Sequence, residues 1–142
     1  MNTHSQKIYD TIVVGAGISG LSAAYHLKKF SPQAEFLVLE GRDNFGGTWD
    51  FFKYPGIRSD SDMHTLGFSF KPWNSRKFIA DGPAIMNYLD ETIEENNLKD
   101  LIKFNMHIES ASWNSVDSLW ELSINTVSYT HLRAHETYTH LV

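Results

Sequence analysis

The chain has 142 residues, of which 42% are hydrophobic and 20% charged, and its formal net charge is −5 at pH 7. This length and composition predict one globular domain rather than a disordered polypeptide. The acidic balance argues against a nucleic-acid binder, and the absence of cysteine excludes disulfides and a cysteine nucleophile. Because neither a signal peptide nor an apolar run of membrane-spanning length is visible, we expect a cytoplasmic protein.

The first forty residues predict a βαβ unit. Residues 9–14 are rich in β-branched side chains, as in a buried strand, and residues 15–20 form a glycine-rich turn. Residues 21–29 have the apolar spacing of a helix, which ends at Ser31, and residues 35–40 read as a second strand. A unit this short places both strands parallel in one sheet.

The remainder of the chain predicts a long loop, a helix, a third strand and a hairpin. Residues 41–73 contain glycine, proline and aromatic residues with little periodicity, and a loop of that length is usually functional. A helix over residues 81–96 has Asp81 as its cap. We expect a third strand at residues 101–108 and a hairpin over residues 111–124.

The segment from residue 127 onward differs from the rest of the chain. Residues 127–137 look like the translation of a transposon-type sequencing adapter. His131 and His135 have a spacing that a metal site on a helix could use, but an artefactual origin explains them better, and we predict no metal site. We therefore divide the chain into residues 1–126 and a non-native tail, residues 127–142, which we expect to be disordered.

The turn after the first strand contains the pattern Gly15-x-Gly17-x-x-Gly20. The first glycine allows a tight turn, the second lets the backbone approach a pyrophosphate, and the third allows close packing of the helix. The helix N-terminus adds free N–H groups to the phosphate site. Glu40 ends the second strand, where a carboxylate accepts hydrogen bonds from the hydroxyls of an adenosine ribose. In this order the features predict a dinucleotide site; a ligand-free glycine turn is the alternative.

The acidic residue also bears on the identity of the nucleotide. The Glu40 carboxylate repels a 2′-phosphate, which favours FAD or NAD(H) over NADP(H) at this site, although the nearby Arg42 weakens the argument. A glycine pair at residues 46–47 would let a second loop, residues 46–50, approach the cofactor beside its pyrophosphate or flavin side. A simple turn is the alternative interpretation of this pair.

Longer motifs extend this pattern, namely Phe45-Gly46-Gly47-Thr48-Trp49 and Tyr54-Pro55-Gly56-Ile57-Arg58-Ser59-Asp60-Ser61-Asp62. With the glycine turn and Glu40, they resemble the flavin-dependent Baeyer–Villiger monooxygenases, in particular their ethionamide-activating type. The similarity covers about residues 8–125. It implies an α/β fold: a truncated, Rossmann-like FAD-binding domain with a parallel sheet, a crossover helix and a β-hairpin, of which residues 1–126 form the N-terminal part.

The resemblance also implies an activity. Members of the family use FAD and NADPH to insert one oxygen atom from O2 into ketones, or to oxidise soft sulfur or nitrogen centres of small-molecule substrates. The second glycine motif, which serves NADPH, and the family's linker signature are absent from this sequence. We therefore expect an N-terminal fragment of such an enzyme, which alone has no turnover and binds FAD weakly.

The resemblance assigns cofactor contacts residue by residue. The FAD pyrophosphate would meet Gly15, Gly17, Ser19 and Gly20, and Glu40 would hold the adenosine ribose. The backbone of Ile108 would contact the adenine side. The flavin side of the cofactor would lie against Gly47, Thr48 and Trp49, with Asp50 and Phe51 close by.

The resemblance gives Asp60 the catalytic position. It would lie near the isoalloxazine and pair with an essential arginine from the NADPH domain, while Arg58 and Ser59 would lie near the nicotinamide nucleotide. Three alternatives stay open: residues 59–62 could merely cap a short helix, Arg58 could form a surface ion pair, and Trp49 could belong to the core.

Two other functions also remain. One is a flavin monooxygenase that oxidises nitrogen or sulfur without Baeyer–Villiger activity. The other is a non-catalytic dinucleotide-binding module, for which the 45–49 and 54–62 motifs would have no purpose.

Overall fold

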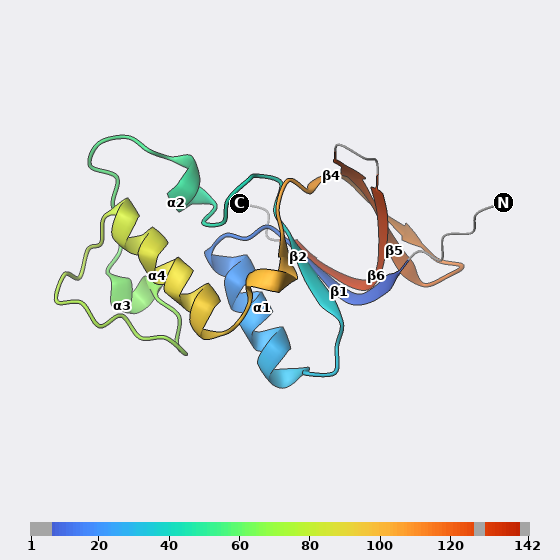
Figure 1. Ribbon diagram of the computed structural model, residues 1–142, viewed down its shortest axis with the longest axis horizontal. Helices are drawn as coiled ribbons and strands as arrows, with labels where there is room; N and C mark the ends of the chain where they lie inside the picture. Colours follow the sequence, from blue (N-terminus) through green and yellow to red (C-terminus); the bar gives the residue numbers. More distant parts are fainter. Residues whose placement is uncertain (1–6, 127–129, 140–142) are drawn as a thin grey trace.

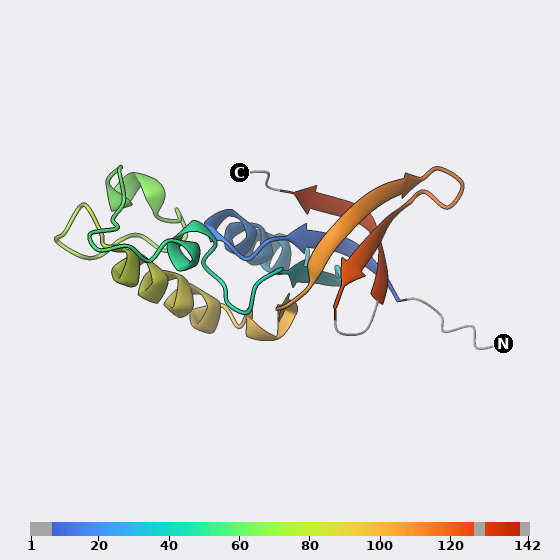
Figure 2. The same cartoon turned by 90° about the horizontal axis from the view of Figure 1, so that it is seen from above.

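A mixed sheet of six strands organises the computed structural model, which describes residues 7–126 and 130–139. In chain order the elements are β1 (Ile8–Val14), α1 (Ile18–Phe30), β2 (Phe36–Leu39), α2 (Thr48–Phe51), α3 (Met63–Leu66), α4 (Gly82–Glu95), the 3-10 turn η1 (Lys99–Leu101), β3 (Ile102–Lys103), β4 (His107–Asn114), β5 (Leu119–Asn125) and β6 (Thr130–Thr139). Helices α2, α3 and α4 lie at one end of the molecule and the β4–β5 hairpin at the other (Figure 1, Figure 2).

The strands follow the order β3-β2-β1-β6-β5-β4 across the sheet. Strands β3, β2, β1 and β6 pair in parallel, and β6, β5 and β4 pair in antiparallel fashion. The predicted α/β Rossmann-like fold, with its crossover helix and hairpin, is therefore confirmed. Helix α1 begins at Ile18 rather than Leu21, so the last glycine of the turn, Gly20, lies inside its first turn.

The alternation of apolar residues along β1 and β2 builds two separate cores. Val13 and Val38 are buried on one face with residues of α1 and α4. Ile12 and Leu39 are buried on the other face, where β5 and β6 supply their neighbours. Successive strand residues point to opposite faces, so both faces of β1 and β2 are covered, as is typical of parallel strands.

The tail does not follow the expectation of disorder over residues 130–139. These residues form β6, which fills the space between β1 and β5 and pairs with both. Leu132 packs against the core face and Ala134 is fully buried there, while Arg133 between them pairs with Glu121 of β5. Without β6, both β1 and β5 would present an open edge of unpaired backbone groups. Residues 127–129 and 140–142 lie outside the described residues.

The expected third strand, residues 101–108, is divided into two pieces. Only Ile102–Lys103 pairs with β2 as β3. Asn105 then adopts a left-handed backbone conformation, with φ of 56°, and donates its N–H to the carbonyl oxygen of Arg42 at 2.9 Å. The chain turns there, and His107 begins β4 of the hairpin. The prediction of one continuous strand was wrong because asparagine tolerates this conformation and ends the strand.

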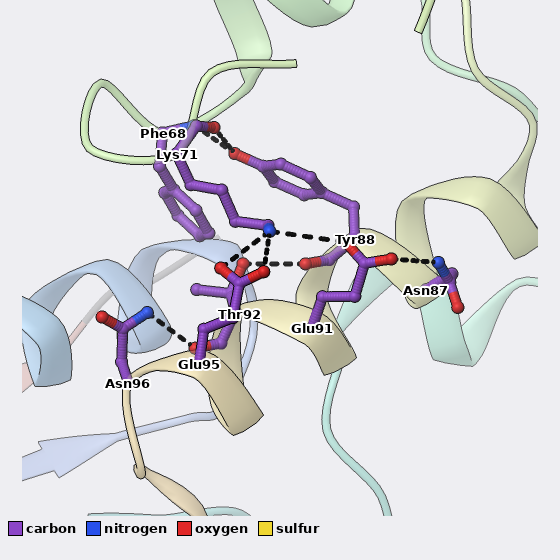
Figure 3. A network of polar contacts seen from close by, with 8 residues as sticks. All are labelled: Phe68, Lys71, Asn87, Tyr88, Glu91, Thr92, Glu95 and Asn96. Carbon is purple, nitrogen blue, oxygen red and sulfur yellow. Dashed lines mark hydrogen bonds and ion pairs between the residues drawn. The ribbon is translucent and has the colours of Figure 1, made fainter. Parts of the chain in front are cut away.

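The long segment before α4 is fastened to that helix by a polar network (Figure 3). Lys71 Nζ lies 2.8 Å from Glu95 Oε1 and 3.3 Å from Glu91 Oε2. The Tyr88 hydroxyl donates to the Lys71 carbonyl at 2.5 Å and accepts from Phe68 N at 2.8 Å. Helix α4 begins where predicted, because Asp81 accepts from Ala84 N and caps it. Helix α4 therefore holds the start of the 67–80 segment in place through Phe68 and Lys71.

Among the described helices, none combines the length and apolar character that crossing a bilayer requires.

Candidate functional site

A cavity of about 240 Å³ lies at the carboxyl end of β1. Here the sheet continues to β2 on one side and to β6 on the other, so the cavity lies where the strand order reverses. Crevices at such switch points are where open α/β sheets bind ligands. The lining residues are Val14, Gly15, Gly17, Ile18, Ser19, Gly20, Glu40, Gly46, Gly47, Thr48 and Trp49.

The glycine turn at this cavity has the close packing that its spacing predicts. Gly15 has a φ of +95°, which turns the chain sharply out of β1. A Cβ on Gly20 would lie 1.9 Å from the carbonyl oxygen of Gly15, so only glycine lets α1 come this close to the turn. The first N–H groups of α1 are thereby held at the wall of the cavity.

The second glycine pair packs directly against the first motif. A Cβ on Gly47, whose φ is +54°, would lie 3.2 Å from the Cα of Gly17. Gly46 donates its N–H to the carbonyl oxygen of Ala16 at 2.8 Å. Residues 46–47 thus join the two loops by backbone contacts, and Thr48 and Trp49 of α2 line the same cavity. The interpretation of residues 46–47 as a simple turn does not describe this arrangement.

Glu40 lies beside the glycine turn, and its side chain is buried in the structure. Its Oε2 accepts from Ala16 N at 2.8 Å, and its Oε1 accepts from Arg42 N at 3.0 Å. Since each carboxylate oxygen has two lone pairs, both oxygens keep acceptor capacity after these bonds. The acid therefore connects the end of β2 to the turn after β1 and still lines the cavity.

Arg42 lies next to this acid, but its guanidinium is engaged elsewhere. Its Nη2 is 2.9 Å from Oδ2 of the buried Asp50 of α2, and the guanidinium lies over the Phe51 ring, 5.0 Å from the centroid. Asn44 also donates to Asp50, at 2.9 Å. Arg42, Asp50 and Phe51 are not among the residues that line the 240 Å³ cavity. In the 240 Å³ cavity the structure thus places Thr48 and Trp49 but not Asp50 or Phe51.

A second cavity, of about 790 Å³, adjoins the first at Trp49, which lines both. Its other walls are formed by Asp50, by residues 52–57, and by Asp81 and the first residues of α4, up to Met86. Partly exposed aromatic rings, among them Tyr54, lie in this segment. Trp49 is only half-buried, so it serves as a shared wall of the two cavities as well as packing on the core.

Residues 58–60 line neither cavity, although they follow directly after Ile57, which lines the 790 Å³ cavity. Ser59 is buried, donates its N–H to the carbonyl oxygen of Ala80 at 2.9 Å and accepts from Ala80 N at 3.1 Å through its hydroxyl. Arg58 forms a β-bridge with Asp81. Asp60 is exposed, and neither Arg58 nor Asp60 has an ion pair with another described residue. The capping alternative applies to a different residue of this motif.

That residue is Asp62, which caps α3. Its carboxylate accepts from the Thr65 backbone N–H and from the Thr65 hydroxyl, both at 3.0 Å. The hydrogen bonds from Thr65 hold the pKa of the Asp62 carboxyl below its usual value. Asp62 is therefore structural, while Asp60, two residues earlier in the chain, is exposed.

Ile108 belongs to β4, where it pairs with Ile124 of the antiparallel strand β5. It is therefore not in the parallel part of the sheet. Two residues before Ile108, the backbone contacts the end of β2: Met106 donates its N–H to the carbonyl oxygen of Glu40 at 2.9 Å. Ile108 does not line the 240 Å³ cavity, but it follows directly after a contact with the acid of that cavity.

Residues 13–91, more than half of the chain, match the family model described as an NAD(P)-binding Rossmann-like domain. The chain belongs to this family. It is also 52% identical over 116 residues to the FAD-containing monooxygenase EthA of Mycolicibacterium smegmatis, an alignment that covers 82% of this chain and 24% of that protein. The chain thus spans about a quarter of the length of the curated relative it matches.

Solved structures of monooxygenases share the fold of this Rossmann-like domain. The NADP-bound cyclohexanone monooxygenase from Rhodococcus sp. Phi1 matches with a TM-score of 0.83 and 27% identity, over 94% of this chain and 25% of that one. An NADP-bound steroid monooxygenase matches with a TM-score of 0.81 and 28% identity, over 90% and 25%. The resemblance to flavin-dependent monooxygenases is confirmed. A match over 94% of the chain exceeds residues 1–126, so it includes part of β6.

Sequence reasoning missed several contributors to the site. Val14 and Ile18 also line the cavity. Ala16 supplies both a donor to Glu40 and an acceptor to Gly46, through backbone groups that leave no trace in the residue type. The one sequence feature that could have indicated this role is the position of Ala16 between two glycines of the motif.

Proposed function

We propose that this chain provides the FAD-binding site of a monooxygenase that uses NADPH and O2 to oxygenate a small molecule. The observation that carries the proposal is the single cavity shared by the glycine turn, Glu40 and the 46–49 loop. Five of its eleven lining residues are glycines, and the other six include one carboxylate, Glu40, and one large aromatic ring, Trp49. This combination suits a diphosphate, a ribose and an aromatic ring system in series.

The start of α1 suits the diphosphate. The first hydrogen bond within the helix runs from Leu21 N to the carbonyl oxygen of Gly17, which leaves the N–H groups of residues 18–20 without acceptors inside the helix. No acidic residue lies in the first turn to neutralise the positive end of the helix dipole. The Ser19 hydroxyl lines the same wall and adds a further donor. An anion is the ligand that these groups satisfy.

Glu40 suits the adenosine ribose, because its two oxygens retain lone pairs for two hydroxyl donors. The carboxylate would repel a 2′-phosphate, which favours FAD over NADP(H) here. The 240 Å³ of this cavity is smaller than a whole dinucleotide requires. We therefore propose that the flavin end continues past Thr48 and Trp49 toward the 790 Å³ cavity, and that Ile108 borders the adenine side.

FAD, when bound, supplies the activation of O2 with electrons taken from NADPH. The residues of this chain bind and orient the cofactor: the glycine amides hold the phosphates, Glu40 holds the ribose, and Trp49 shields one side from water. We propose that the exposed Asp60, with Arg58, faces the nicotinamide nucleotide and an arginine supplied from outside this chain. The substrate would be a ketone or a soft sulfur or nitrogen centre, and the cytoplasmic location stays a prediction.

The first test is a titration of the 142-residue chain with FAD, in which the change in flavin fluorescence reports binding. We expect FAD to bind, ADP to compete with it because ADP shares the diphosphate and ribose, and FMN not to compete. Gly17→Ala is the informative variant. Its Cβ would lie 3.7 Å from the nearest heavy atom, Gly47 Cα, and its φ is −79°, so alanine fits without strain.

In that variant the methyl group occupies space that the phosphate backbone approach requires, so FAD affinity should fall at least about tenfold while the urea midpoint stays unchanged. Equal FAD affinity in the two chains would contradict the pyrophosphate assignment. Tighter binding of NADH than of FAD would favour the alternative, a non-catalytic dinucleotide-binding module. Oxidation of a sulfide but of no ketone by the complete enzyme would favour the nitrogen- and sulfur-oxidising alternative.

A further inference from the structure

Asp50 is the buried acid of this region that the proposed function does not use. Its side chain is only 5% exposed, and both oxygens are occupied. Oδ2 pairs with Arg42 Nη2 at 2.9 Å, while Oδ1 accepts from Asn44 at 2.9 Å and lies 3.5 Å from Lys53 Nζ. Asp50 borders the 790 Å³ cavity but not the 240 Å³ one. Because both of its oxygens are engaged by protein side chains, we infer that Asp50 positions those side chains rather than a ligand.

The partner of Asp50 begins beside the ribose acid. The Arg42 N–H donates to Glu40 Oε1 at 3.0 Å, so the base of the Arg42 side chain is fixed next to the carboxylate that faces the cavity. An arginine near this acid is what a Rossmann site uses to accept a 2′-phosphate. In the sequence, Glu40 favours a nucleotide without a 2′-phosphate, and Arg42, two residues later, weakens that argument.

In the structure, the Arg42 guanidinium points to other partners and does not contribute to the selection of the nucleotide. The guanidinium is held at one nitrogen by Asp50 and lies over the Phe51 ring, and its Nη1 is buried without a hydrogen-bond partner among the described residues. That orphan nitrogen indicates a side chain placed by its salt bridge rather than by an optimal set of hydrogen bonds. Both anchors, Asp50 and Phe51, belong to α2, the helix that also carries Thr48 and Trp49.

We propose that Asp50 is a specificity-determining residue: it holds Arg42 away from the ribose, so that Glu40 alone faces the 2′ position. The inference rests on the proposed function, since it concerns the same nucleotide site. Removing the charge of Asp50 frees a guanidinium whose backbone is already fixed at the acid. A freed Arg42 would find its strongest new acceptor in a 2′-phosphate, to which it offers paired N–H donors.

The test compares the affinities of the 142-residue chain for ADP and for 2′-phospho-ADP by titration calorimetry. We expect the parental chain to prefer ADP. Asp50→Asn should shift the affinity ratio toward the 2′-phosphorylated ligand by about tenfold, the effect of one charge-assisted contact. Asp43→Asn is the matched control, because it removes one negative charge from an exposed position in the loop before α2 and should leave the ratio unchanged.

Two further variants separate specificity from a general structural effect. In Asp50→Asn with Arg42→Gln, the gain for 2′-phospho-ADP should disappear, because no guanidinium remains to be released. Arg42→Gln alone should leave the parental ratio unchanged, which keeps the proposal testable even if Asp50→Asn unfolds. A loss of 2′-phospho-ADP affinity in Arg42→Gln would show that Arg42 already faces the ribose, and would overturn the proposal.

The outcomes also distinguish this inference from the proposed function. If the folded parental chain binds ADP but Asp50→Asn and Asp43→Asn give the same ratio, only the role of Asp50 is overturned. If the folded parental chain binds neither ligand, the nucleotide site itself is wrong, and both proposals fall.

Discussion

Replacing Glu40 should destabilise the chain even without a cofactor. The carboxylate accepts from Ala16 N at 2.8 Å, in a buried setting, and from Arg42 N at 3.0 Å, in a partly buried one. Glutamine keeps one acceptor oxygen, which we expect to stay with Ala16, and leaves the Arg42 N–H to water. A hydrogen bond to a charged group contributes about 1.5–3 kcal/mol. Since water compensates in part, we expect Glu40→Gln to lower the free energy of unfolding by about 1–2 kcal/mol.

Glu40→Ala removes both acceptors and leaves the buried Ala16 N–H unsatisfied, so the loss should rise to about 3 kcal/mol. The assay is urea unfolding of the cofactor-free chain, followed by tryptophan fluorescence. With a slope near 2 kcal/mol per M, these losses correspond to midpoint shifts of about 0.5–1 M for glutamine and about 1.5 M for alanine. Such losses are a large part of the stability of a domain of this size.

Glu35→Gln is the matched control, since Glu35 lies at the opposite end of the same strand, β2. Its carboxylate forms a surface ion pair with Lys7 at 3.2 Å, with both side chains more than half exposed. Exposed pairs of this kind contribute little, so the free energy of unfolding should change by less than about 0.5 kcal/mol. If Glu40→Gln and Glu35→Gln gave the same midpoint, the Glu40 carboxylate would not connect β2 to the glycine turn as we infer.

Three further outcomes follow from the packing. Gly20→Ala should lower stability by about 1–3 kcal/mol in urea unfolding, because the new Cβ would lie 1.9 Å from the Gly15 carbonyl oxygen. Asp81→Ala should cost about 1 kcal/mol in the same assay through loss of the α4 cap. Burial raises the pKa of Tyr88, so its contribution is complete below about pH 10 and lost as the pH rises through the folded value. Stability should therefore fall above pH 10, and less steeply in Tyr88→Phe.

The parts of the fold that the sequence predicts best are those specified by local patterns. The βαβ unit, the capped helix at Asp81 and the hairpin all have their signals within a few turns of chain. The cofactor site belongs to the same class, because its glycines and Glu40 fall within one βαβ unit. That is why Gly15, Gly17, Ser19, Gly20 and Glu40 meet in one cavity, which Gly47, Thr48 and Trp49 join from the segment after β2.

The parts that the sequence does not predict depend on partners far away in the chain. Asn105 ends a strand because its N–H reaches the carbonyl oxygen of Arg42, a contact that no periodicity reveals. Asp50 reads as a cofactor residue from its motif, yet its oxygens bind Arg42 and Asn44. The residues of β6 were excluded from the predicted fold because their sequence looks like an adapter. In the structure, they pair with β1 and β5, whose edges would otherwise be open.

The two roles of Glu40 determine how nucleotide binding must be measured. Because backbone N–H groups already hold both oxygens, the carboxylate is oriented before a ribose arrives, and binding need not immobilise it. The same bonds mean that any change at Glu40 alters the glycine turn together with the ribose contact. A loss of FAD affinity in a Glu40 variant therefore combines two causes. Gly17→Ala separates them, since alanine fits at Gly17 without strain and alters only the approach of the phosphates.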